Sequence, residues 1–469
     1  MRSGEEAAEL MSDKRLNTQL DLAFPTEETG EAPRAAEEVT ESFAAIRRAE
    51  SPGMGDQLME AVCEWRNIQQ AVRRVKTNKG SAGVDGMTVH QLSAHLKQHW
   101  PTIRAHLVAG TYAPHPVKRV EIPKPDGGTR LLGIPTVLDR CIQQAVLQIL
   151  QGDWDQTFSA HSYGFRPGRS AHQAVEQAQR YLADGYYWVV DLDLEQFFDR
   201  VGHDKLMATL AKRINDKRVL KLIRAFLTAG VLAQGLVSPT AAGTPQGGPL
   251  SPLLSNIVLD ELDREVKRRG LRFVRYADDC NIYVRSHRAG LRVLASPTRF
   301  LTSRLKLQVN QQKSAVGLGA TRTFLGFSFT AAREPKRRIA PKALKRVKRQ
   351  IRALTRRTRT VTIARMARDL SHYLRGWLGY FGKCQTPSVL QRLEEWVRRR
   401  LRSAMWTQWK HVRVRFAELR KRGVGLALAA RTARSAHGPW RLAQSPALTI
   451  ALPKTYFAAL GIPKFTGGR

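Results

Sequence analysis

Apolar residues recur along the chain at two spacings, and each spacing predicts a different kind of element. At helical spacing, one series of apolar positions follows a Thr136-x-x-Asp139 capping motif, and a second runs from Leu254 to Val266 and stops at Gly270. The first series predicts an amphipathic helix with a capped N-terminus. The second predicts a helix that begins after a loop rich in glycine and proline. Both apolar stripes are interpreted as core.

Two short apolar runs predict a β-hairpin. Residues 271–274 and 281–284 are rich in apolar and β-branched side chains, and they flank the segment 275–280, which reads Arg-Tyr-Ala-Asp-Asp-Cys. Two such runs joined by a short polar stretch are typical of antiparallel strands. Asp278 and Asp279 are therefore expected at the turn of the hairpin.

Acidic residues also interrupt a strongly apolar run upstream. The segment 188–194 predicts a buried strand that carries Asp191 and Asp193, which would project to one side of an ideal strand. A fold rarely gathers such carboxylates near two others without a cation. Mg²⁺ binds through one or two carboxylates plus substrate phosphates. Two such ions, about 3.5–4 Å apart, can activate an attacking hydroxyl and stabilise a leaving oxygen, which indicates phosphoryl transfer of the polymerase kind.

Together these motifs resemble a known family. The Tyr-Ala-Asp-Asp hairpin, with Asp-x-x-x-Phe-Phe-Asp at 193–199, resembles the palm of a reverse transcriptase. The most specific match is Pro-Gln-Gly-Gly-Pro-Leu-Ser-Pro at 245–252. It is similar to a template- and nucleotide-positioning block of the reverse transcriptase–maturase proteins encoded by bacterial group II introns. The resemblance runs from Met59 to the mid-400s. It implies an α+β right-hand polymerase, with fingers and palm, followed by an α-helical thumb or maturase domain.

The resemblance also implies a metal site. In the family pattern the upstream ligand falls at Asp193, with Asp191 as the alternative. The catalytic residues implied are Asp193, Asp278 and Asp279, which would hold two Mg²⁺ ions together with the backbone carbonyl of Leu194.

A nucleotide site follows from the same resemblance. Alternation at 120–122 and an Asp-Gly-Gly turn predict a hairpin, which in the family clamps the incoming dNTP. The residues implied in nucleotide binding are Lys124, Arg130, Phe198, Gln246, Gly247 and Lys313. Phe198 would exclude a ribose 2′-hydroxyl, and Lys313 would neutralise or protonate the leaving pyrophosphate. From the residues alone, core packing for Phe198 and a surface position for Lys313 stay open.

The charge of the chain indicates a polyanionic partner. Among 469 residues, 77 are Lys or Arg and 40 are Asp or Glu, so the formal net charge is +37. Nucleic acid is the first candidate. A membrane surface is the alternative, but no apolar run approaches the roughly 20 residues that span a bilayer, and no signal peptide is visible. Four scattered cysteines argue against a zinc site and a disulfide framework. We therefore expect a cytoplasmic protein without a membrane partner.

Basic residues are concentrated where contacts with RNA are expected. Arg166 and Arg169 lie in a loop, 161–170, that glycine and proline stiffen, which suits contact with a nucleic-acid backbone. From residue 335 onward, Lys and Arg recur at helical intervals, and aromatic residues follow among them. The residues expected to bind RNA in that region are Lys345, Lys348, Arg375 and Arg399. Most of the aromatic residues there, and His161 in the loop, are interpreted as packed.

The chain is predicted to contain four segments. Residues 1–55 are acidic and interrupted by proline, which is typical of a disordered extension. Residues 56–332 are assigned to fingers and palm, and residues 333–410 to the helical thumb or maturase domain. Residues 411–469 are assigned to a short basic DNA-binding tail without an endonuclease module.

The resemblance implies an RNA-directed DNA polymerase of a group II intron that also acts as a maturase in splicing and retrohoming. It resembles the class that lacks an endonuclease. The expected partners are intron RNA as template, a DNA target or primer, and dNTPs, and the protein would act as a monomer or homodimer. Three alternatives stay open: a domesticated reverse transcriptase in DNA repair or phage defence, an RNA-binding splicing factor without polymerase activity, and a CRISPR-associated enzyme.

Overall fold

The computed structural model describes residues 57–123, 129–195, 197–233, 236–238, 243 and 247–465. The predictions for residues 1–55, Lys124 and Gln246 lie outside the described residues, and so does the side chain of Arg130. The backbone of Arg130 lies in a strand, opposite Ile122.

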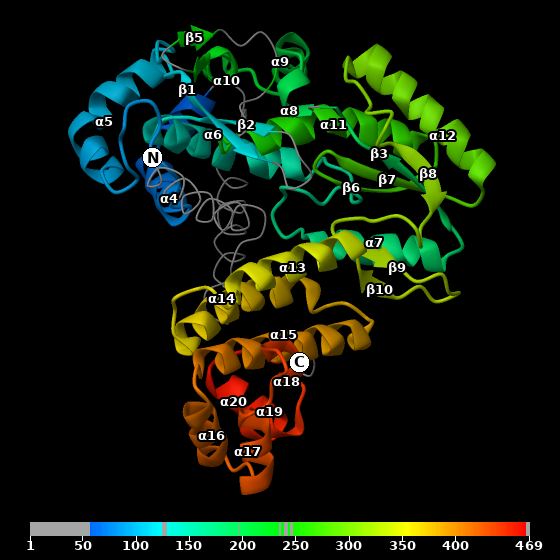
Figure 1. Ribbon diagram of the computed structural model, residues 1–469. Helices are drawn as coiled ribbons and strands as arrows, with labels where there is room; N and C mark the ends of the chain where they lie inside the picture. The colour runs from blue at the N-terminus through cyan, green and yellow to red at the C-terminus, as the bar shows by residue number, and fades with distance from the viewer. Residues whose placement is uncertain are drawn as a thin grey trace. The chain divides into compact units, whose positions relative to one another are not determined.

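The chain forms two compact units that divide between Lys336 and Arg337, close to the predicted boundary after residue 332. Figure 1 shows the first unit in blue to green and the second in yellow to red. The helices of the first unit are α3 (Leu58–Val62), α4 (Trp65–Thr77), α5 (Leu92–Val108), α6 (Val137–Asp155), α7 (Ala171–Ala183), α8 (Phe197–Arg200), α9 (His203–Ala211), α10 (Lys217–Thr228), α11 (Ser251–Arg268), α12 (His287–Phe300) and the π-helical η1 (Leu301–Leu305).

Two four-stranded sheets lie among these helices, so the predicted α+β class is confirmed. The first sheet has the order β2 (Thr129–Ile134), β1 (Val117–Pro123), β4 (Val231–Ala233), β5 (Leu236–Ser238). The second has the order β6 (Arg272–Tyr276), β7 (Asp279–Val284), β3 (Trp188–Leu192), β8 (Ala315–Leu318). A short strand, β9 (Phe327–Phe329), ends the described strands of this unit.

The second sheet is antiparallel throughout and is buried at its centre. Val190 in β3 pairs with Ile282 in β7 and with Val316 in β8. Val190 and Ile282 are fully buried, and α12 packs against β3, β7 and β8 (Figure 1). Because both neighbours of β3 are fixed by apolar contacts, its register is fixed as well. The end of β3 therefore has a defined position opposite the start of β7.

The predicted helix after Thr136 is confirmed as α6, and its first turn is capped as the sequence suggested. Thr136 Oγ1 accepts a hydrogen bond from the Asp139 amide at 3.1 Å and donates one to Asp139 Oδ2 at 2.6 Å. Ile142 and Val146 are buried in the core of the first unit. The helix predicted from Leu254 is α11, which begins at Ser251.

The second unit is helical apart from β10 (Arg337–Ile339) in the residues described. Its helices are α13 (Pro341–Leu354), α14 (Ile363–Phe381), α15 (Pro387–Gln408), α16 (Val412–Lys421), α17 (Leu426–Ala433), α18 (Pro439–Leu442), α19 (Pro446–Ala451) and α20 (Lys454–Ala459). Trp406 is almost fully buried, and Trp377 and Phe381 pack against the same core. The prediction that most aromatic residues here pack between helices is confirmed.

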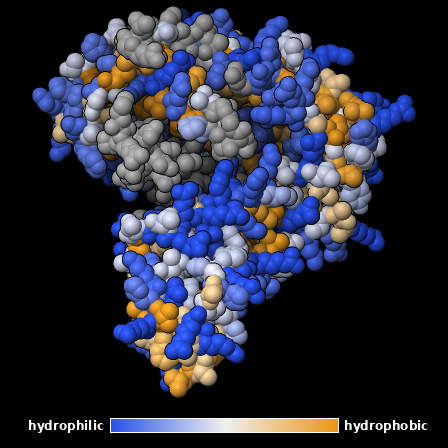
Figure 2. Space-filling model, viewed as in Figure 1, coloured by the Kyte–Doolittle hydropathy of each residue, from blue (hydrophilic) through white to orange (hydrophobic). Residues whose placement is uncertain are grey.

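Residues 411–465 do not form the short tail that the sequence predicted. They fold into α16 to α20, and Leu419, Leu448 and Phe457 belong to the core that α13 to α15 build. Each short apolar run between the prolines forms a helix of four to ten residues, so the segment is part of the folded unit. Its binding to DNA stays a prediction. Figure 2 shows apolar side chains at the lower end of this unit. Val412 and Val414 in α16 and Leu426 in α17 are exposed apolar residues.

Among the residues that the structure describes, no helix is both long enough and apolar enough to cross a lipid bilayer.

Candidate active site

The β6–β7 hairpin presents its two carboxylates as the sequence predicted. Tyr276 pairs with Asp279, so the strands are joined by a two-residue loop, Ala277 and Asp278. Ala277 has a φ of 57°, a left-handed conformation that costs a residue with a β-carbon roughly 1–2 kcal/mol. Two-residue hairpins need positive φ in the loop to match the twist of their strands, and glycine usually supplies it.

The upstream carboxylate lies beside this hairpin. β3 ends at Leu192, which pairs with Cys280, so the next residue along, Asp193, falls opposite Asp279. The backbone at Asp193 is fixed on both sides: its amide donates to Ser314 Oγ at 3.0 Å, and its carbonyl accepts from the Asn310 amide at 2.8 Å. The fold therefore brings all three predicted catalytic aspartates to one edge of the sheet.

The neighbouring carboxylates also affect the pKa of Asp279. Burial and then the negative charges of Asp278, Asp193 and Asp191 raise the pKa of Asp279 to about 7. Lys313 opposes this shift, and its Nζ lies 3.9 Å from Asp193 Oδ2 with two thirds of the side chain exposed. The lysine predicted at the leaving group thus lies at the carboxylates.

Asp191, the alternative ligand, has a cationic partner of its own. Arg322 Nε lies 3.4 Å from Asp191 Oδ2. Burial raises the pKa of Asp191 to about 6, and the charge of Arg322 opposes that shift. Sequence reasoning missed Arg322, because nothing in its local pattern distinguishes it from the other basic residues of the chain.

The donor set fits a hard divalent cation by its chemistry. Carboxylate oxygens are the ligands that Mg²⁺ prefers, and their mutual repulsion is what a bound cation would relieve. In the part of the chain that the structure describes, no three His, Cys, Asp or Glu side chains are arranged closely enough to hold an ion by themselves. Leu194, whose carbonyl was the further ligand expected, forms an isolated bridge with Val309. The contact of its carbonyl with a metal stays a prediction.

Phe198 follows Asp193 by five residues and lies in the short helix α8. It is half-buried in α8, and its ring centroid is 5.3 Å from that of Phe197. The backbone of Gly243 crosses this short helix so closely that a β-carbon at Gly243 would lie 2.9 Å from the Phe198 carbonyl oxygen. His203 Nε2 contacts the Gly243 carbonyl oxygen at 2.6 Å. These contacts fix the backbone under Phe198 while part of its side chain stays exposed.

The glycines of the Pro-Gln-Gly-Gly motif allow close backbone approach. Gly247 has a φ of 137°, and a β-carbon there would lie 2.6 Å from the carbonyl oxygen of Gly133 in β2. A β-carbon at Gly248 would lie 2.4 Å from Oε1 of Gln143 in α6. The loop that carries Gly247 and Gly248 thus packs between the β1–β2 hairpin and α6. The predicted nucleotide-positioning loop therefore contacts the hairpin predicted to clamp the nucleotide.

We expect Gly247→Ala to lower the free energy of unfolding by roughly 1–3 kcal/mol, because alanine is strained at this φ and its β-carbon meets backbone. Urea unfolding followed by circular dichroism measures the change. Gly152→Ala in α6 is the control: among the described residues, no atom beyond the adjacent residues and backbone of its own helix lies within 4 Å of the added β-carbon, and alanine favours the helix. Equal stability of the two variants would contradict the close approach described above.

The structure corrects the prediction that Arg166 contacts RNA. Its residue surface is only 9% exposed, and Nε donates to Asp155 Oδ1 at 2.7 Å. Nη1 donates to the carbonyls of Ser159 and Ser162, and Nη2 to the Asp155 carbonyl. The guanidinium is therefore buried, and its hydrogen bonds stabilise the loop. Arg169 is half-buried, donating to the Ala160 carbonyl, and its contact with RNA stays a prediction.

His161 is packed, as predicted. Its Nδ1 contacts the Tyr181 hydroxyl at 3.0 Å, and its ring meets Phe273 edge-on.

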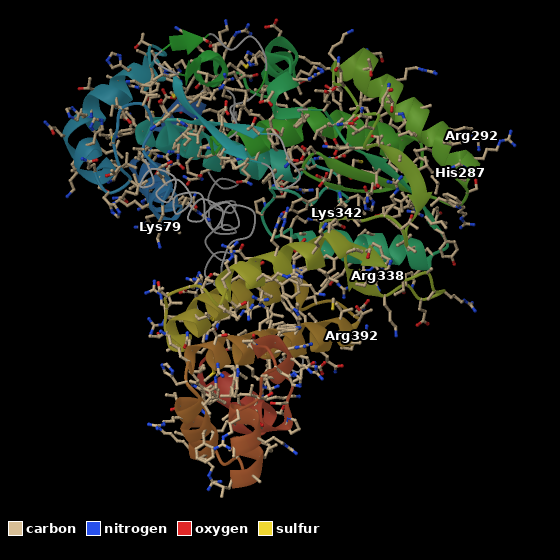
Figure 3. All side chains as sticks on the ribbon, viewed as in Figure 1. Lys79, His287, Arg292, Arg338, Lys342 and Arg392 are labelled. Carbon is tan, nitrogen blue, oxygen red and sulfur yellow. The ribbon has the colours of Figure 1, made fainter. Side chains whose placement is uncertain are left out.

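The basic residues of the second unit divide into exposed and engaged side chains. Lys345, Lys348 and Arg375 are exposed, as a contact with RNA requires. Arg399 instead donates from Nε and Nη2 to the Trp440 carbonyl and stacks on the Trp440 ring at 4.0 Å. Arg399 is half-buried and joins α15 to α18 through these contacts, and its contact with RNA stays a prediction. Figure 3 shows two further basic side chains, Lys342 on α13 and Arg392 on α15, which are also exposed.

Comparison with known proteins adds to this geometry. Residues 122–329 match the family described as "Reverse transcriptase (RNA-dependent DNA polymerase)", and residues 344–423 match "Group II intron, maturase-specific domain". The chain is 34% identical to Protein YkfC of Escherichia coli (strain K12) over 293 residues, which cover 54% of this chain and 76% of that protein.

Two further likenesses cover less of their counterparts. The chain is 38% identical to the group II intron-encoded protein LtrA of Lactococcus lactis subsp. cremoris over 206 residues, which are 44% of this chain and 34% of LtrA. Among solved structures, a chain of "Partial Cas6-RT-Cas1--Cas2 complex" is 24% identical with a TM-score of 0.34, covering 52% of this chain and 42% of that one.

Proposed function

The chain belongs to the group II intron reverse transcriptase and maturase family, and we propose that it copies RNA into DNA at Asp193, Asp278 and Asp279. The observation that carries this assignment of the site is the register of the second sheet, in which β3 pairs with β7. Leu192 pairs with Cys280, which brings the carboxylate that follows β3 opposite the carboxylate that begins β7. Reverse transcriptases generally use divalent metal ions, and we propose Mg²⁺ here because all the side-chain donors are carboxylates.

In the proposed reaction, the 3′-hydroxyl of a DNA primer attacks the α-phosphate of a dNTP, and pyrophosphate leaves. Asp193, Asp278 and Asp279 would bind two Mg²⁺ ions. Bound there, the ions supply activation of the hydroxyl and stabilisation of the leaving oxygen. Lys313 lies at the Asp193 carboxylate. From there its ammonium group can neutralise the charge of the leaving pyrophosphate or donate a proton to it.

The proposed nucleotide site extends from these acids to the fingers. Phe198 would lie under the sugar, and the Gly247 loop would hold template and nucleotide against β2, where its backbone already lies. We also assign Lys124, Arg130 and Gln246 to the triphosphate and the template, by their positions in the family's motifs.

Primer extension tests the proposal. A 5′-labelled DNA primer annealed to an RNA template is incubated with the protein, dNTPs and Mg²⁺, with and without excess EDTA. We expect template-length product with Mg²⁺ and none with EDTA, because the carboxylates cannot align the phosphates alone. Absence of product with Mg²⁺, while RNA binding persists, would favour a splicing factor without polymerase activity.

We further propose that the second unit binds intron RNA as a maturase in splicing and retrohoming. Residues 344–423 match the maturase-specific domain, and the exposed face of α13 carries Lys345 and Lys348. Phosphate contacts of this kind dominate affinity for RNA. With intron RNA, a DNA target and dNTPs as partners, we place the protein in the cytoplasm, where it would act as a monomer or homodimer.

The double variant Lys345→Ala/Lys348→Ala tests this surface. We expect RNA affinity to fall about tenfold at physiological salt. The slope of log affinity against log salt concentration should fall in magnitude by about one to two, because fewer counterions are released on binding when two phosphate contacts are lost. Fluorescence anisotropy with intron RNA across a range of KCl concentrations measures both quantities. The matched control is Lys217→Ala/Lys221→Ala, two exposed lysines on α10 in the first unit. Equal weakening by the two double variants would contradict a specific role for α13.

A further inference from the structure

A fully buried arginine lies directly beneath the Asp-Asp turn. The Arg275 side chain, in β6, has no exposed surface, and neither has that of Asp263 in α11. Nε and Nη2 of Arg275 donate to the two carboxylate oxygens of Asp263 at 2.8 and 2.7 Å. This is a bidentate pair, the geometry that only a planar guanidinium provides.

The remaining arm of the guanidinium reaches the turn itself. Nη1 donates to the carbonyl oxygen of Ala277 at 2.9 Å and to Asn256 Oδ1 at 2.9 Å. Ala277 is the residue with the left-handed φ, and the next residue is Asp278. A strained backbone conformation persists only where its surroundings hold it in place. Arg275 is therefore the side chain that ties the strained residue to the helix α11.

A second set of contacts holds the same turn from the other side. The Arg275 amide donates to the His161 carbonyl, and the Arg275 carbonyl accepts from the Tyr163 amide, both at 2.9 Å. Asn256 Nδ2 donates to the Gly164 carbonyl at 2.9 Å. Gly164 lies so close that a β-carbon on it would be 2.2 Å from the Ala277 nitrogen. The loop around Gly164, the helix α11 and the turn thus share one hydrogen-bond network.

Stability alone does not explain a charge pair in this position. Apolar side chains of similar volume often replace a buried ion pair without loss of stability. Apolar side chains could not, however, hold the carbonyl oxygen of Ala277, because only a donor can do so. The feature of Arg275 that packing cannot replace is its contact with the turn that carries Asp278 and Asp279.

We propose that Arg275 is a positioning residue, which with Asp263 and Asn256 holds the Ala277 carbonyl so that the carboxylates of Asp278 and Asp279 are placed to bind the divalent cation. This inference rests on the proposed function. It assigns a role to three residues that do not touch substrate and lie outside the acid motif.

The variant Arg275→Lys tests the inference, because lysine keeps the positive charge opposite Asp263 and cannot reach all the acceptors of the guanidinium fork. We expect affinity for Mn²⁺, used as a spectroscopic probe, to fall about tenfold, as losses of supporting contacts around metal ligands do. Electron paramagnetic resonance of free Mn²⁺ measures this affinity in the absence of catalysis. The variant Asp278→Asn gives the amount of Mn²⁺ that binds at other sites. In primer extension, the Mg²⁺ concentration for half-maximal rate should rise by about the same factor, with the Kd for primer–template unchanged.

The matched control is Arg218→Lys, in the same unit. Arg218 also makes charged hydrogen bonds, with Asp216 and Glu60, and it lies in α10, outside the elements that form the turn network. We expect it to lose stability without a change in Mn²⁺ affinity. Equal Mn²⁺ affinity of the two lysine variants would overturn the inference and leave Arg275 a purely structural residue.

A double variant keeps the inference open to refutation if Arg275→Lys does not fold. Arg275→Met/Asp263→Leu removes both buried charges together, which a fold tolerates far better than one unpaired charge. We expect circular dichroism to show that this variant is folded, and we expect the same loss of Mn²⁺ affinity. Wild-type affinity in this variant would overturn the inference. A wild-type protein that neither binds Mn²⁺ nor extends a primer would overturn the proposed function, and the inference with it.

Discussion

Asp278→Asn is expected to lower the rate of primer extension by on the order of 10³-fold, because a change of several kcal/mol in metal-assisted stabilisation of the transition state corresponds to such a factor. Asparagine keeps the size of the side chain and removes the negative charge. The turn should stay in place, since Arg275 holds it through the backbone carbonyl of Ala277. Single-nucleotide extension on an RNA template, in saturating dNTP and Mg²⁺, measures the rate.

The matched control is Asp204→Asn in α9. Its carboxylate is 89% exposed and pairs with Arg224 on the surface of the same unit. An exposed pair of this kind contributes little to stability, so both the rate and the fold should be unchanged. RNA affinity should be equal in the two variants. Extension by Asp278→Asn at a rate near that of wild type would show that this carboxylate does not bind the catalytic metal.

Phe198→Val is expected to weaken discrimination against ribonucleotides by about 100-fold, since removing bulk from a pocket changes selectivity by up to roughly that factor. The expectation rests on the position of Phe198, half-buried in α8 five residues after Asp193, with its backbone fixed against Gly243. The measurement is the ratio of kcat/KM for dCTP and CTP opposite a template guanine. Incorporation of dCTP should change much less than incorporation of CTP.

Phe197→Leu separates this effect from general loosening of the helix. Phe197 is almost fully buried and packs in the core of the first unit, so its truncation should lower stability. Selectivity for the sugar should not change. If both variants relaxed selectivity equally, or neither did, Phe198 would be a packing residue, as the sequence alone allowed.

The parts of the site that the sequence could predict are those fixed by neighbours along the chain. The β6–β7 hairpin follows from two apolar runs and a short polar turn, and the α6 cap follows from Thr136 and Asp139. Period-two and period-3.6 patterns are local signals, and burial enforces them. Local pattern could not decide whether Asp191 or Asp193 is the upstream metal ligand. The family resemblance favoured Asp193, and in the structure Asp191 pairs with Arg322.

What the sequence could not predict are pairings between distant residues. Arg275 and Asp263 are separated by a helix end and a strand, and nothing local shows that both side chains point inward. The same limitation explains the error at Arg166, where a loop with glycine and proline suggested exposure. Its guanidinium instead turns inward to Asp155. A basic residue in a strongly basic chain looks like a nucleic-acid contact until its neighbours in space are known.

The difference between exposed and engaged basic residues in the second unit has the same origin. Arg399 and Lys345 both lie on helices in a region dense in positive charge. The carbonyl and ring of Trp440, forty-one residues further along, engage Arg399, while Lys345 stays exposed. Helical spacing alone could not distinguish them, because Trp440 comes from α18, a separate helix within the segment predicted as a short DNA-binding tail.

The most direct test of RNA-templated synthesis at the three aspartates is the sequence of the DNA that the wild-type protein makes on an RNA template of mixed sequence. We predict a product that is complementary to the template over its whole length, and its loss in Asp278→Asn. Untemplated addition, or complementary product from Asp278→Asn at the wild-type rate, would contradict the account.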